Sequence, residues 1–308
     1  MVYNRVAIII ISIALLYSCK DSNKQYVATR QIIEVGQLET VAEAYENVKL
    51  IDVRKSEKYV EGHIPEALNI WRTDIQDTAN YEYGGMLASK SVIERLFSDL
   101  GITNNDFLVL YDAKGQVDAA RLWWLLDRYG YSNMALLNGG IQAWKRANLP
   151  ISTKSQNVKT SSSFKFTADI NNARFADKNV VFENITSKNS ILVDCRSTVE
   201  FLGKELKKGA FRAGHIPRAV HIDFMECINV GGKKDCTFKT TEELFEIYNR
   251  NGIAKSDSII IYCHSGVRSA HSTFVLTQLM GFTNVKNYDG SWIEWSYYGE
   301  LPIKPLTN

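Results

Sequence analysis

Two stretches, LIDVR at residues 50–54 and LVDCR at residues 192–196, organise the whole sequence, because the same pattern follows each of them. Gly-His-Ile-Pro comes next in both cases, at residues 62–65 and at residues 214–217. The step from the aspartate to the histidine is 11 residues in the first copy and 21 in the second, which predicts an extra surface loop around residues 203–209. Motifs that recur in the same order predict two copies of one structural unit.

The later half of each copy repeats with the same spacing. The apolar run at residues 107–112 ends in Asp112 and the run at residues 259–263 ends in Cys263, so these two residues take equivalent positions. From either of them it is 27 residues to a glycine and 32 residues to a tryptophan. This double match supports an internal duplication.

Short apolar runs alternate with helical patterns inside each copy. Residues 259–262 are branched or aromatic, which predicts a buried strand, and apolar residues recur at helical spacing behind it. Trp123 and Trp124 lie in the equivalent helical pattern of the first copy, and we interpret them as core residues. The alternation predicts an α/β fold, with a mostly parallel sheet flanked by helices in each copy. We place the first domain at residues 33–150, a linker rich in Ser, Thr, Asn and Lys at residues 151–165, and the second domain at residues 166–304.

The N-terminus has a pattern of its own. Arg5 precedes an apolar run at residues 6–16, which is too short for a comfortable transmembrane span and predicts a secretory signal at residues 1–18. The ending LYSC resembles a bacterial lipobox, which implies a lipid on Cys19, a tether at residues 19–32 and a location in the cell envelope, on the periplasmic or surface side of a bacterial membrane. A signal cut elsewhere and a single membrane anchor are the alternatives.

The other cysteines and the overall charge narrow the function further. The net charge is +2, so nothing in the composition favours a nucleic-acid partner. Cys227 and Cys236 flank a turn-like Gly-Gly pair and are candidates for a disulfide in an oxidising compartment, with two unpaired thiols as the alternative. Cys195 lies at the end of a strand-like run, where we expect a buried, inert thiol.

Cys263 lies where a predicted strand ends and a predicted helix begins, and we take it as the candidate nucleophile. Backbone N–H groups at the start of a helix, together with the helix dipole, stabilise an anion, so the pKa of this thiol is expected to fall. Gly266 lets the loop curl tightly, and Arg268 adds a permanent positive charge. The alternative is a buried cysteine before an ordinary turn.

This loop resembles the active-site loop of the rhodanese family, a cysteine followed by a short glycine-containing ring that often ends in Arg. The resemblance covers about residues 33–303, because further motifs in both copies agree with the family pattern in the right order. These are the Asp-x-Arg motifs at residues 52–54 and 194–196, the Gly-His-Ile-Pro motifs at residues 62–65 and 214–217, and the motifs NGGIQAW at residues 138–144 and GSWIEW at residues 290–295.

The resemblance implies two tandem rhodanese-like domains and a sulfurtransferase that needs no metal or organic cofactor. Cys263 would take a sulfane sulfur from thiosulfate as a persulfide and pass it to cyanide or a thiol. Asp112 cannot carry a persulfide, so the first domain would be catalytically silent. The resemblance also implies a substrate-binding loop, in which Arg268 helps to bind the anionic donor and backbone N–H groups hold the persulfide. Its residues are His264, Ser265, Gly266, Val267 and Arg268.

One departure from the family pattern and the size of the loop bear on the substrate. Glu200 stands where tandem members often carry a second arginine, which weakens the case for a carboxylate-bearing donor such as 3-mercaptopyruvate. Only four residues separate Cys263 from Arg268, a ring that suits one sulfur atom better than the phosphoryl group of the related phosphatases. A lipoprotein that carries or senses a persulfide without turnover remains the non-enzymatic alternative. The two aspartate–arginine motifs and the two Gly-His motifs are interpreted as structural.

Overall fold

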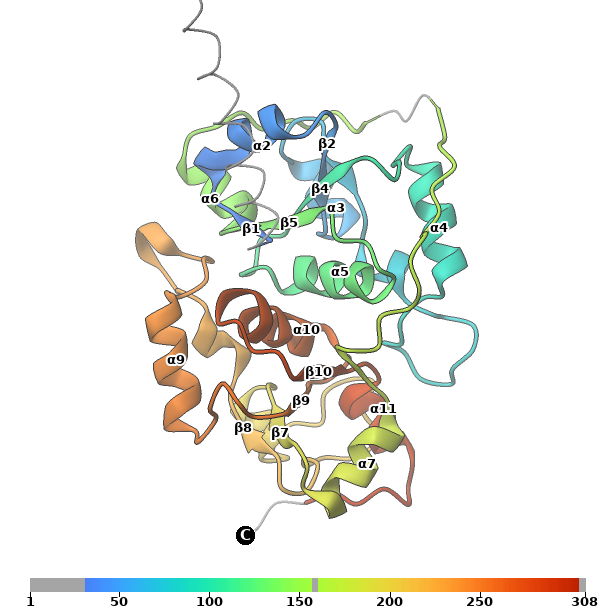
Figure 1. Cartoon of the computed structure of the whole chain (residues 1–308), viewed down its shortest axis with the longest axis vertical. Coiled ribbons are helices and arrows are strands. Elements are labelled where there is room, and N and C mark those ends of the chain that lie inside the picture. Colours follow the sequence, from blue (N-terminus) through green and yellow to red (C-terminus); the bar gives the residue numbers. More distant parts are fainter. Residues whose placement is uncertain (1–30, 157–159, 305–308) are drawn as a thin grey trace, which may run out of the picture.

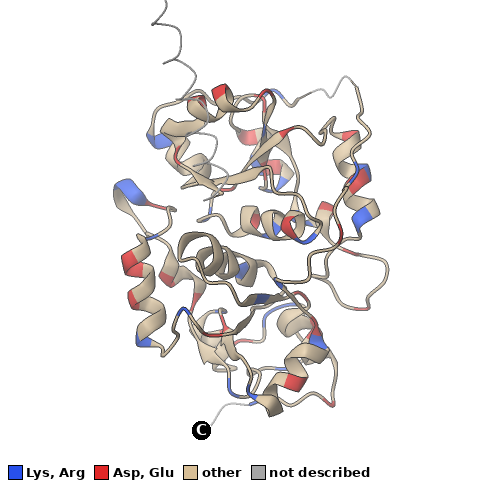
Figure 2. Ribbon diagram, viewed as in Figure 1, with Lys and Arg blue, Asp and Glu red and all other residues tan. Residues whose placement is uncertain are grey.

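The computed structural model describes residues 31–156 and 160–304, and it consists of two α/β units stacked on each other (Figure 1). The expected signal, Cys19 and nearly all of the expected tether lie outside these residues. Among the residues that the structure describes, no helix is both long and apolar enough to span a membrane. Lys, Arg, Asp and Glu are scattered over both units (Figure 2).

Each unit contains a five-stranded sheet in which every strand pair is parallel, and the strand order is the same in both. The order in the first sheet is β1 (Ile32–Ile33), β5 (Met134–Leu137), β4 (Phe107–Tyr111), β2 (Val48–Asp52) and β3 (Leu68–Asn69). The order in the second sheet is β6 (Phe175–Ala176), β10 (Val285–Tyr288), β9 (Ile259–Tyr262), β7 (Ile191–Asp194) and β8 (Val220–His221). The predicted fold class and the duplication are therefore confirmed.

Helices cover both faces of each sheet, as parallel strands require. In the first unit these are α2 (Leu38–Ala44), α3 (Ser56–Glu61), α4 (Lys90–Asp99), α5 (Val117–Arg128) and α6 (Gly140–Arg146). In the second they are α7 (Lys178–Ser187), α8 (Thr198–Phe201), α9 (Thr241–Arg250), α10 (Val267–Phe274) and α11 (Ser291–Tyr297). Short 3-10 turns occur at η1 (Val35–Gln37), η2 (Arg72–Ile75), η3 (Phe224–Cys227) and η4 (Gly232–Lys234), and a π-helical turn at Val275–Leu279 continues α10.

The two central strands are apolar because both of their faces are covered. All five residues of β4 and all four residues of β9 are buried. Each strand ends in a tyrosine whose hydroxyl accepts a backbone N–H from the Gly-His-Ile-Pro motif of its own unit. Tyr111 accepts from Ile64 at 3.1 Å, and Tyr262 accepts from Ile216 at 3.0 Å. The motif is thereby held to the central strand.

The Asp-x-Arg motifs are buried ion pairs, as predicted. Arg54 donates to Asp52 at 2.6 Å and to the Gly62 carbonyl at 2.8 Å. The second unit repeats this arrangement, with Arg196 donating to Asp194 at 2.6 Å and to the Gly214 carbonyl at 2.7 Å. A guanidinium that bridges two backbone segments fixes the end of the strand, so these residues shape the scaffold.

The histidines of the Gly-His motifs also have structural contacts. Nδ1 of His63 lies 2.8 Å from the Tyr59 carbonyl, and Nδ1 of His215 lies 2.8 Å from the Phe201 carbonyl. Each histidine also stacks on the ring of the same neighbour, with centroids 3.7 and 3.9 Å apart. The prediction that both anchor loops is confirmed.

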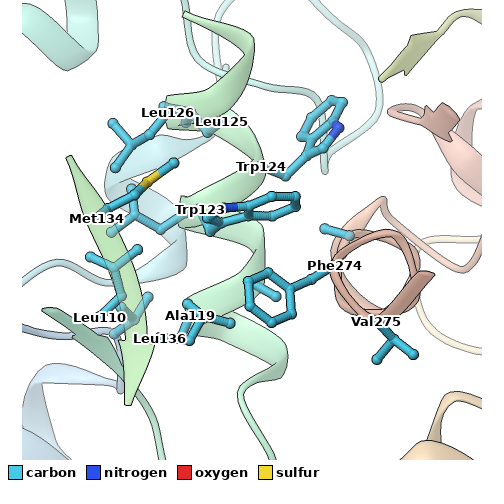
Figure 3. Close-up of a cluster of buried hydrophobic side chains, with 14 of the residues drawn as sticks. Leu110, Ala119, Trp123, Trp124, Leu125, Leu126, Met134, Leu136, Phe274 and Val275 are labelled. Atoms are coloured by element: carbon cyan, nitrogen blue, oxygen red, sulfur yellow. The ribbon is translucent and has the colours of Figure 1, made fainter. Parts of the chain in front are cut away.

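The units share one hydrophobic core, which forms where α5 packs against α10 (Figure 1). Trp123 and Trp124 are completely buried, which confirms their prediction as core residues. The Trp123 ring meets the edge of Phe274 from α10, with ring centroids 4.9 Å apart (Figure 3). The first unit is therefore packed directly on the helix that follows Cys263.

Trp123→Ala is expected to lower the free energy of unfolding by about 3–5 kcal/mol, because it opens a cavity in the shared core. Urea unfolding followed by circular dichroism measures this change. Phe182→Ala is the control, since Phe182 is 49% exposed on α7 and its loss should cost no more than about 0.5 kcal/mol. Equal midpoints for the two variants would contradict the importance of the α5–α10 packing.

Candidate active site

Cys263 lies in the loop between β9 and α10, at the carboxyl edge of the second sheet. Gly266 begins the helix with a φ of +75°, a left-handed conformation that favours glycine. A Cβ at this position would lie 2.5 Å from the Asp289 carbonyl oxygen and 2.6 Å from Nη1 of Arg121. The loop can therefore close this tightly only with glycine here.

Residues at the start of α11 hold the loop in place through hydrogen bonds. The Ser291 hydroxyl accepts the backbone N–H groups of Cys263 at 3.1 Å and of Gly266 at 3.0 Å. Trp292 and Ile293 in turn donate their backbone N–H groups to the carbonyls of Cys263 and His264, at 2.9 and 3.0 Å. The Gly-Ser-Trp motif of the sequence thus fixes the backbone of the loop that carries the candidate nucleophile.

The equivalent loop of the first unit shows what this backbone geometry binds. The Asp112 carboxylate accepts four backbone N–H groups, at 2.8–3.3 Å, from Lys114, Gln116, Asp118 and Ala119. Burial and the neighbouring Asp118 raise the pKa of Asp112 to about 6, so the group is still ionised at neutral pH. The loop that joins strand and helix is therefore an anion site, which the first unit fills with its own side chain.

In the second unit the sulfur of Cys263 takes the place of that carboxylate. Cys263 is 1% exposed, and the Ser269 hydroxyl donates to its Sγ at 3.4 Å. Burial by itself would raise the pKa of the Cys263 thiol. The Cys195 thiol, the charge of Arg268 and Ser269 outweigh burial, and they hold this pKa well below its ordinary value. These contacts therefore favour the thiolate form of Cys263, the form that acts as a nucleophile.

Arg268 is held in place by an ion pair that the sequence did not reveal. Its guanidinium donates to both oxygens of Glu200, at 2.6 and 2.8 Å. Burial raises the pKa of Glu200, but the pair with Arg268 dominates and brings this pKa down to about 2. Glu200 thus fixes the arginine beside Cys263.

The remaining residues of the predicted loop lie together as expected from their sequence. His264 is 8% exposed, and its Nε2 lies 3.1 Å from the Lys208 carbonyl in the predicted extra loop. Burial lowers the pKa of His264, which keeps the ring neutral at pH 7. Ser265 packs against Gly85 of the first unit, where an added Cβ would come within 2.9 Å of the Ser265 Cβ. Val267 is buried at the first turn of α10.

A cavity of about 590 Å³ opens between the two units and leads to Cys263. Its wall includes the predicted loop residues His264, Ser265, Val267 and Arg268, together with the apolar side chains of Trp71, Phe224, Met225 and Ile228. Three lysines also line it and form no ion pair with another described residue; they are Lys55 and Lys114 from the first unit and Lys207 from the second. The cavity is therefore both roomy and positively charged.

The expected disulfide between Cys227 and Cys236 is not present, because both thiols are free. Cys227 is buried under η3 with its sulfur 3.8 Å from the Tyr248 hydroxyl. Cys236 faces the first unit, 3.6 Å from the Ala113 carbonyl. Backbone hydrogen bonds close the loop instead, and they leave the two sulfurs on different sides of it.

Sequence reasoning missed three residues around Cys263. Cys195, expected to be an inert thiol, contacts Cys263 side chain to side chain. Ser269 lies at the offset from Cys263 that Asp118 has from Asp112, so the repeat itself was the signal that could have found it. Arg121 comes from the first unit and donates to the Gly266 carbonyl at 3.3 Å, and no local pattern marks it. The described residues contain no group of three or more His, Cys, Asp or Glu placed to hold a metal ion.

Comparison with known proteins gives consistent matches over most of the chain. Residues 37–147 and 178–297 match the family profile described as Rhodanese-like domain. A protein of Saccharopolyspora erythraea named "Putative thiosulfate sulfurtransferase" is 37% identical over 258 residues, which cover 81% of this chain and 86% of that protein. Sulfur carrier protein TtuD of Thermus thermophilus is 35% identical over 256 residues, covering 80% of this chain and 86% of the carrier. The crystal structure of SseA from Escherichia coli, a 3-mercaptopyruvate sulfotransferase, superposes with a TM-score of 0.74 at 25% identity, covering 86% of this chain and 99% of SseA.

Arg268→Met is expected to raise the pH midpoint of Cys263 alkylation by about one to three units, because it removes a positive charge beside the thiolate. In the unchanged protein the midpoint should lie well below the ordinary pKa of a cysteine thiol. The rate of carboxamidomethylation with iodoacetamide, followed across pH by mass spectrometry of the Cys263 peptide, measures both midpoints.

Glu200→Gln is the matched control, since it breaks the same ion pair from its negative side. It should lower the midpoint, whereas a general loosening of the loop would move both variants in the same direction. A midpoint that is insensitive to Arg268→Met would contradict the electrostatic account of the site.

Proposed function

The chain belongs to the rhodanese-like family and is a sulfurtransferase, and on this premise we propose that Cys263 carries a sulfur atom from thiosulfate to a thiophilic acceptor. One observation carries the proposal. The thiol of Cys263, whose pKa is well below its ordinary value, occupies the loop position at which the first unit binds a carboxylate with four backbone N–H groups. Such a loop stabilises the anion before and after sulfur is added.

The reaction proceeds in two half-reactions. The Cys263 thiolate attacks the outer sulfur of thiosulfate, an S–S bond forms on the cysteine, the S–S bond of the donor breaks, and sulfite leaves with the electron pair. The backbone N–H groups of residues 264–268, apart from that of Gly266, which donates to Ser291, then hold the negative outer sulfur of the persulfide together with the Ser269 hydroxyl. Cyanide or a thiolate attacks that sulfur next, and the Cys263 thiolate is restored.

The charges of the cavity support thiosulfate as the donor. Thiosulfate is a compact dianion, and Lys55, Lys114 and Lys207 supply cationic groups at the cavity wall that no described carboxylate pairs with. Both terminal nitrogens of Arg268 already donate to Glu200, so the arginine contributes charge to the site and the fork between these two nitrogens is not open to a carboxylate of the donor. The second candidate donor is 3-mercaptopyruvate, favoured by the likeness to SseA and by the room that the cavity offers.

The first unit has no nucleophile in its loop and is proposed to act as a wall of the site. Asp112 occupies the loop's anion position with its own carboxylate, which leaves no place there for a donor. Lys55, Trp71 and Lys114 of this unit nevertheless line the cavity that leads to Cys263. Its contribution to the reaction is therefore the binding of substrates.

At the N-terminus, we propose that Cys19 carries a lipid and places the enzyme in the cell envelope. The basic start, the apolar run at residues 6–16 and the lipobox-like ending support this assignment. In cells, Cys19→Ala should move the protein from the detergent phase to the aqueous phase of a Triton X-114 extraction. Partition that does not change would overturn the lipid anchor and leave the sulfur chemistry untouched.

Thiocyanate formation from thiosulfate and cyanide is expected for the unchanged protein, with the parallel double-reciprocal lines of a ping-pong mechanism. Cys263→Ser should lose at least about 1,000-fold in turnover, because it removes the thiol on which the persulfide forms. Cys236→Ser is the control, since Cys236 lines the same cavity and should be dispensable.

The same assay compares donors through kcat/KM. We expect the value for thiosulfate to exceed that for 3-mercaptopyruvate; the reverse order would assign the enzyme to the second candidate. Full activity in Cys263→Ser would overturn the proposed site.

A further inference from the structure

Cys195 and Cys263 form a pair of neighbouring thiols on adjacent strands. β7 and β9 run parallel with Asp194 opposite Tyr262, so the next residues along each strand, Cys195 and Cys263, are neighbours in register. The Cys195 N–H donates to the Tyr262 carbonyl at 3.0 Å, which continues this register to the cysteine. Paired strands lie about 4.7–4.9 Å apart, and a disulfide joins Cα atoms about 4.4–6.8 Å apart. The two side chains also interact with each other, and the Cys195 Sγ donates to the carbonyl of Tyr262, the residue before Cys263, at 3.2 Å.

The two thiols face different surroundings. Cys263 lines the cavity through which a donor arrives, whereas Cys195 has 0% exposure and lies in the core on the other side of it. A sulfur atom added to Cys263 can extend toward the cavity that Cys263 lines. Cys195 lies beside Cys263 on the neighbouring strand, within the buried core. A thiol in this place can reach the inner sulfur of a Cys263 persulfide without entering the cavity.

Packing alone does not require a thiol at this position. The first unit has Val53 in the place of Cys195, and Val53 is 1% exposed in its own core. The two units therefore differ at this pair of neighbouring positions. The first unit has Val53 beside Asp112, and the second has Cys195 beside Cys263.

We propose that Cys195 is a second reactive thiol, which attacks the inner sulfur of the Cys263 persulfide and expels the outer sulfur as hydrosulfide. This inference rests on the proposed formation of that persulfide. In the step, a bond forms between the two Sγ atoms, the S–S bond of the persulfide breaks, and the Cys195 proton leaves on the hydrosulfide. The products are a Cys195–Cys263 disulfide and one hydrosulfide ion, and atoms and charge are conserved.

The disulfide returns to the dithiol when two thiol equivalents from a small-molecule reductant attack Cys263 from the cavity. Thiosulfate and two thiols then become sulfite, hydrogen sulfide and one external disulfide, so the chain acquires a thiol-dependent, sulfide-producing activity. Burial and the neighbouring Cys263 charge hold the pKa of Cys195 well above its ordinary value. Because only a small fraction of Cys195 is ionised, its attack on the Cys263 persulfide is slow. The attack therefore removes the outer sulfur mainly when no external acceptor is present.

The test uses the full reduced chain with thiosulfate, without oxygen, cyanide or added thiol. Intact-mass spectrometry and a sulfide trap follow the reaction, and peptide mapping locates the S–S bond. We expect one sulfur to be added and then lost, with one equivalent of sulfide released, a final mass two hydrogens below that of the reduced protein, and a disulfide between Cys195 and Cys263. Cys195→Val, which copies the first unit, should keep the added sulfur and release no sulfide. Cys227→Val is the matched control, a buried cysteine without contact to Cys263, and should behave like the unchanged protein.

The outcomes separate this inference from the proposed function. If the unchanged protein keeps its added sulfur as long as Cys195→Val does, the second reactive thiol is wrong while the persulfide mechanism stands. If no variant gains a sulfur on Cys263, the proposed function fails and the inference fails with it. The disulfide is located by peptide mapping of the unchanged protein. This result does not depend on whether Cys195→Val folds correctly.

Discussion

Where a buried strand turns directly into a buried helix, the first N–H groups of the helix need an acceptor, and the chemistry of this protein depends on that need. In the first unit the Asp112 carboxylate satisfies four of them. In the second unit the Cys263 sulfur occupies the same place, and its pKa is held well below the ordinary value because Cys195, Arg268 and Ser269 together outweigh the cost of burial. One backbone geometry thus yields a closed structural turn or a nucleophile, depending on a single residue.

The silent unit contributes directly to the shape of the active loop. Arg121 on α5 is 1% exposed, pairs with Asp289 at 2.6 Å and also donates to the Gly266 carbonyl. A buried ion pair adds little net stability, since removing two charges from water costs about as much as their attraction returns. It does fix geometry, because displacing either partner leaves an unpaired charge in the core. The pair therefore holds Gly266 in the conformation that keeps the N–H groups together.

Much of this structure could be predicted from the sequence, and the parts that could not share a cause. The duplication, the parallel sheets, the buried Asp52–Arg54 pair and the position of Cys263 follow from local patterns and their spacing. The ion pair of Arg268 with Glu200 joins residues 68 positions apart, and a pair so distant along the chain produces no periodic pattern in the sequence. The place of Cys195 beside Cys263 was missed for a related reason: its burial was read correctly from the strand pattern, but the strand register that brings the two residues together is a property of the sheet. The disulfide expected for Cys227 was wrong because spacing alone does not tell which way two thiols point.

The charge balance around Cys263 explains why a domain without a nucleophile still matters to the reaction. Glu200, with a pKa of about 2, and the Cys263 thiolate are both negative at neutral pH, so the single charge of Arg268 is shared between two anions. The immediate surroundings of the sulfur therefore offer little net attraction to a dianionic donor. That attraction must come from charges farther out, and two of the three unpaired lysines of the cavity, Lys55 and Lys114, belong to the first unit. They are exposed to solvent and act over roughly one Debye length, about 8 Å at physiological ionic strength. At that range they draw the donor into the cavity without binding the thiolate itself, a separation of roles that one domain alone would not provide.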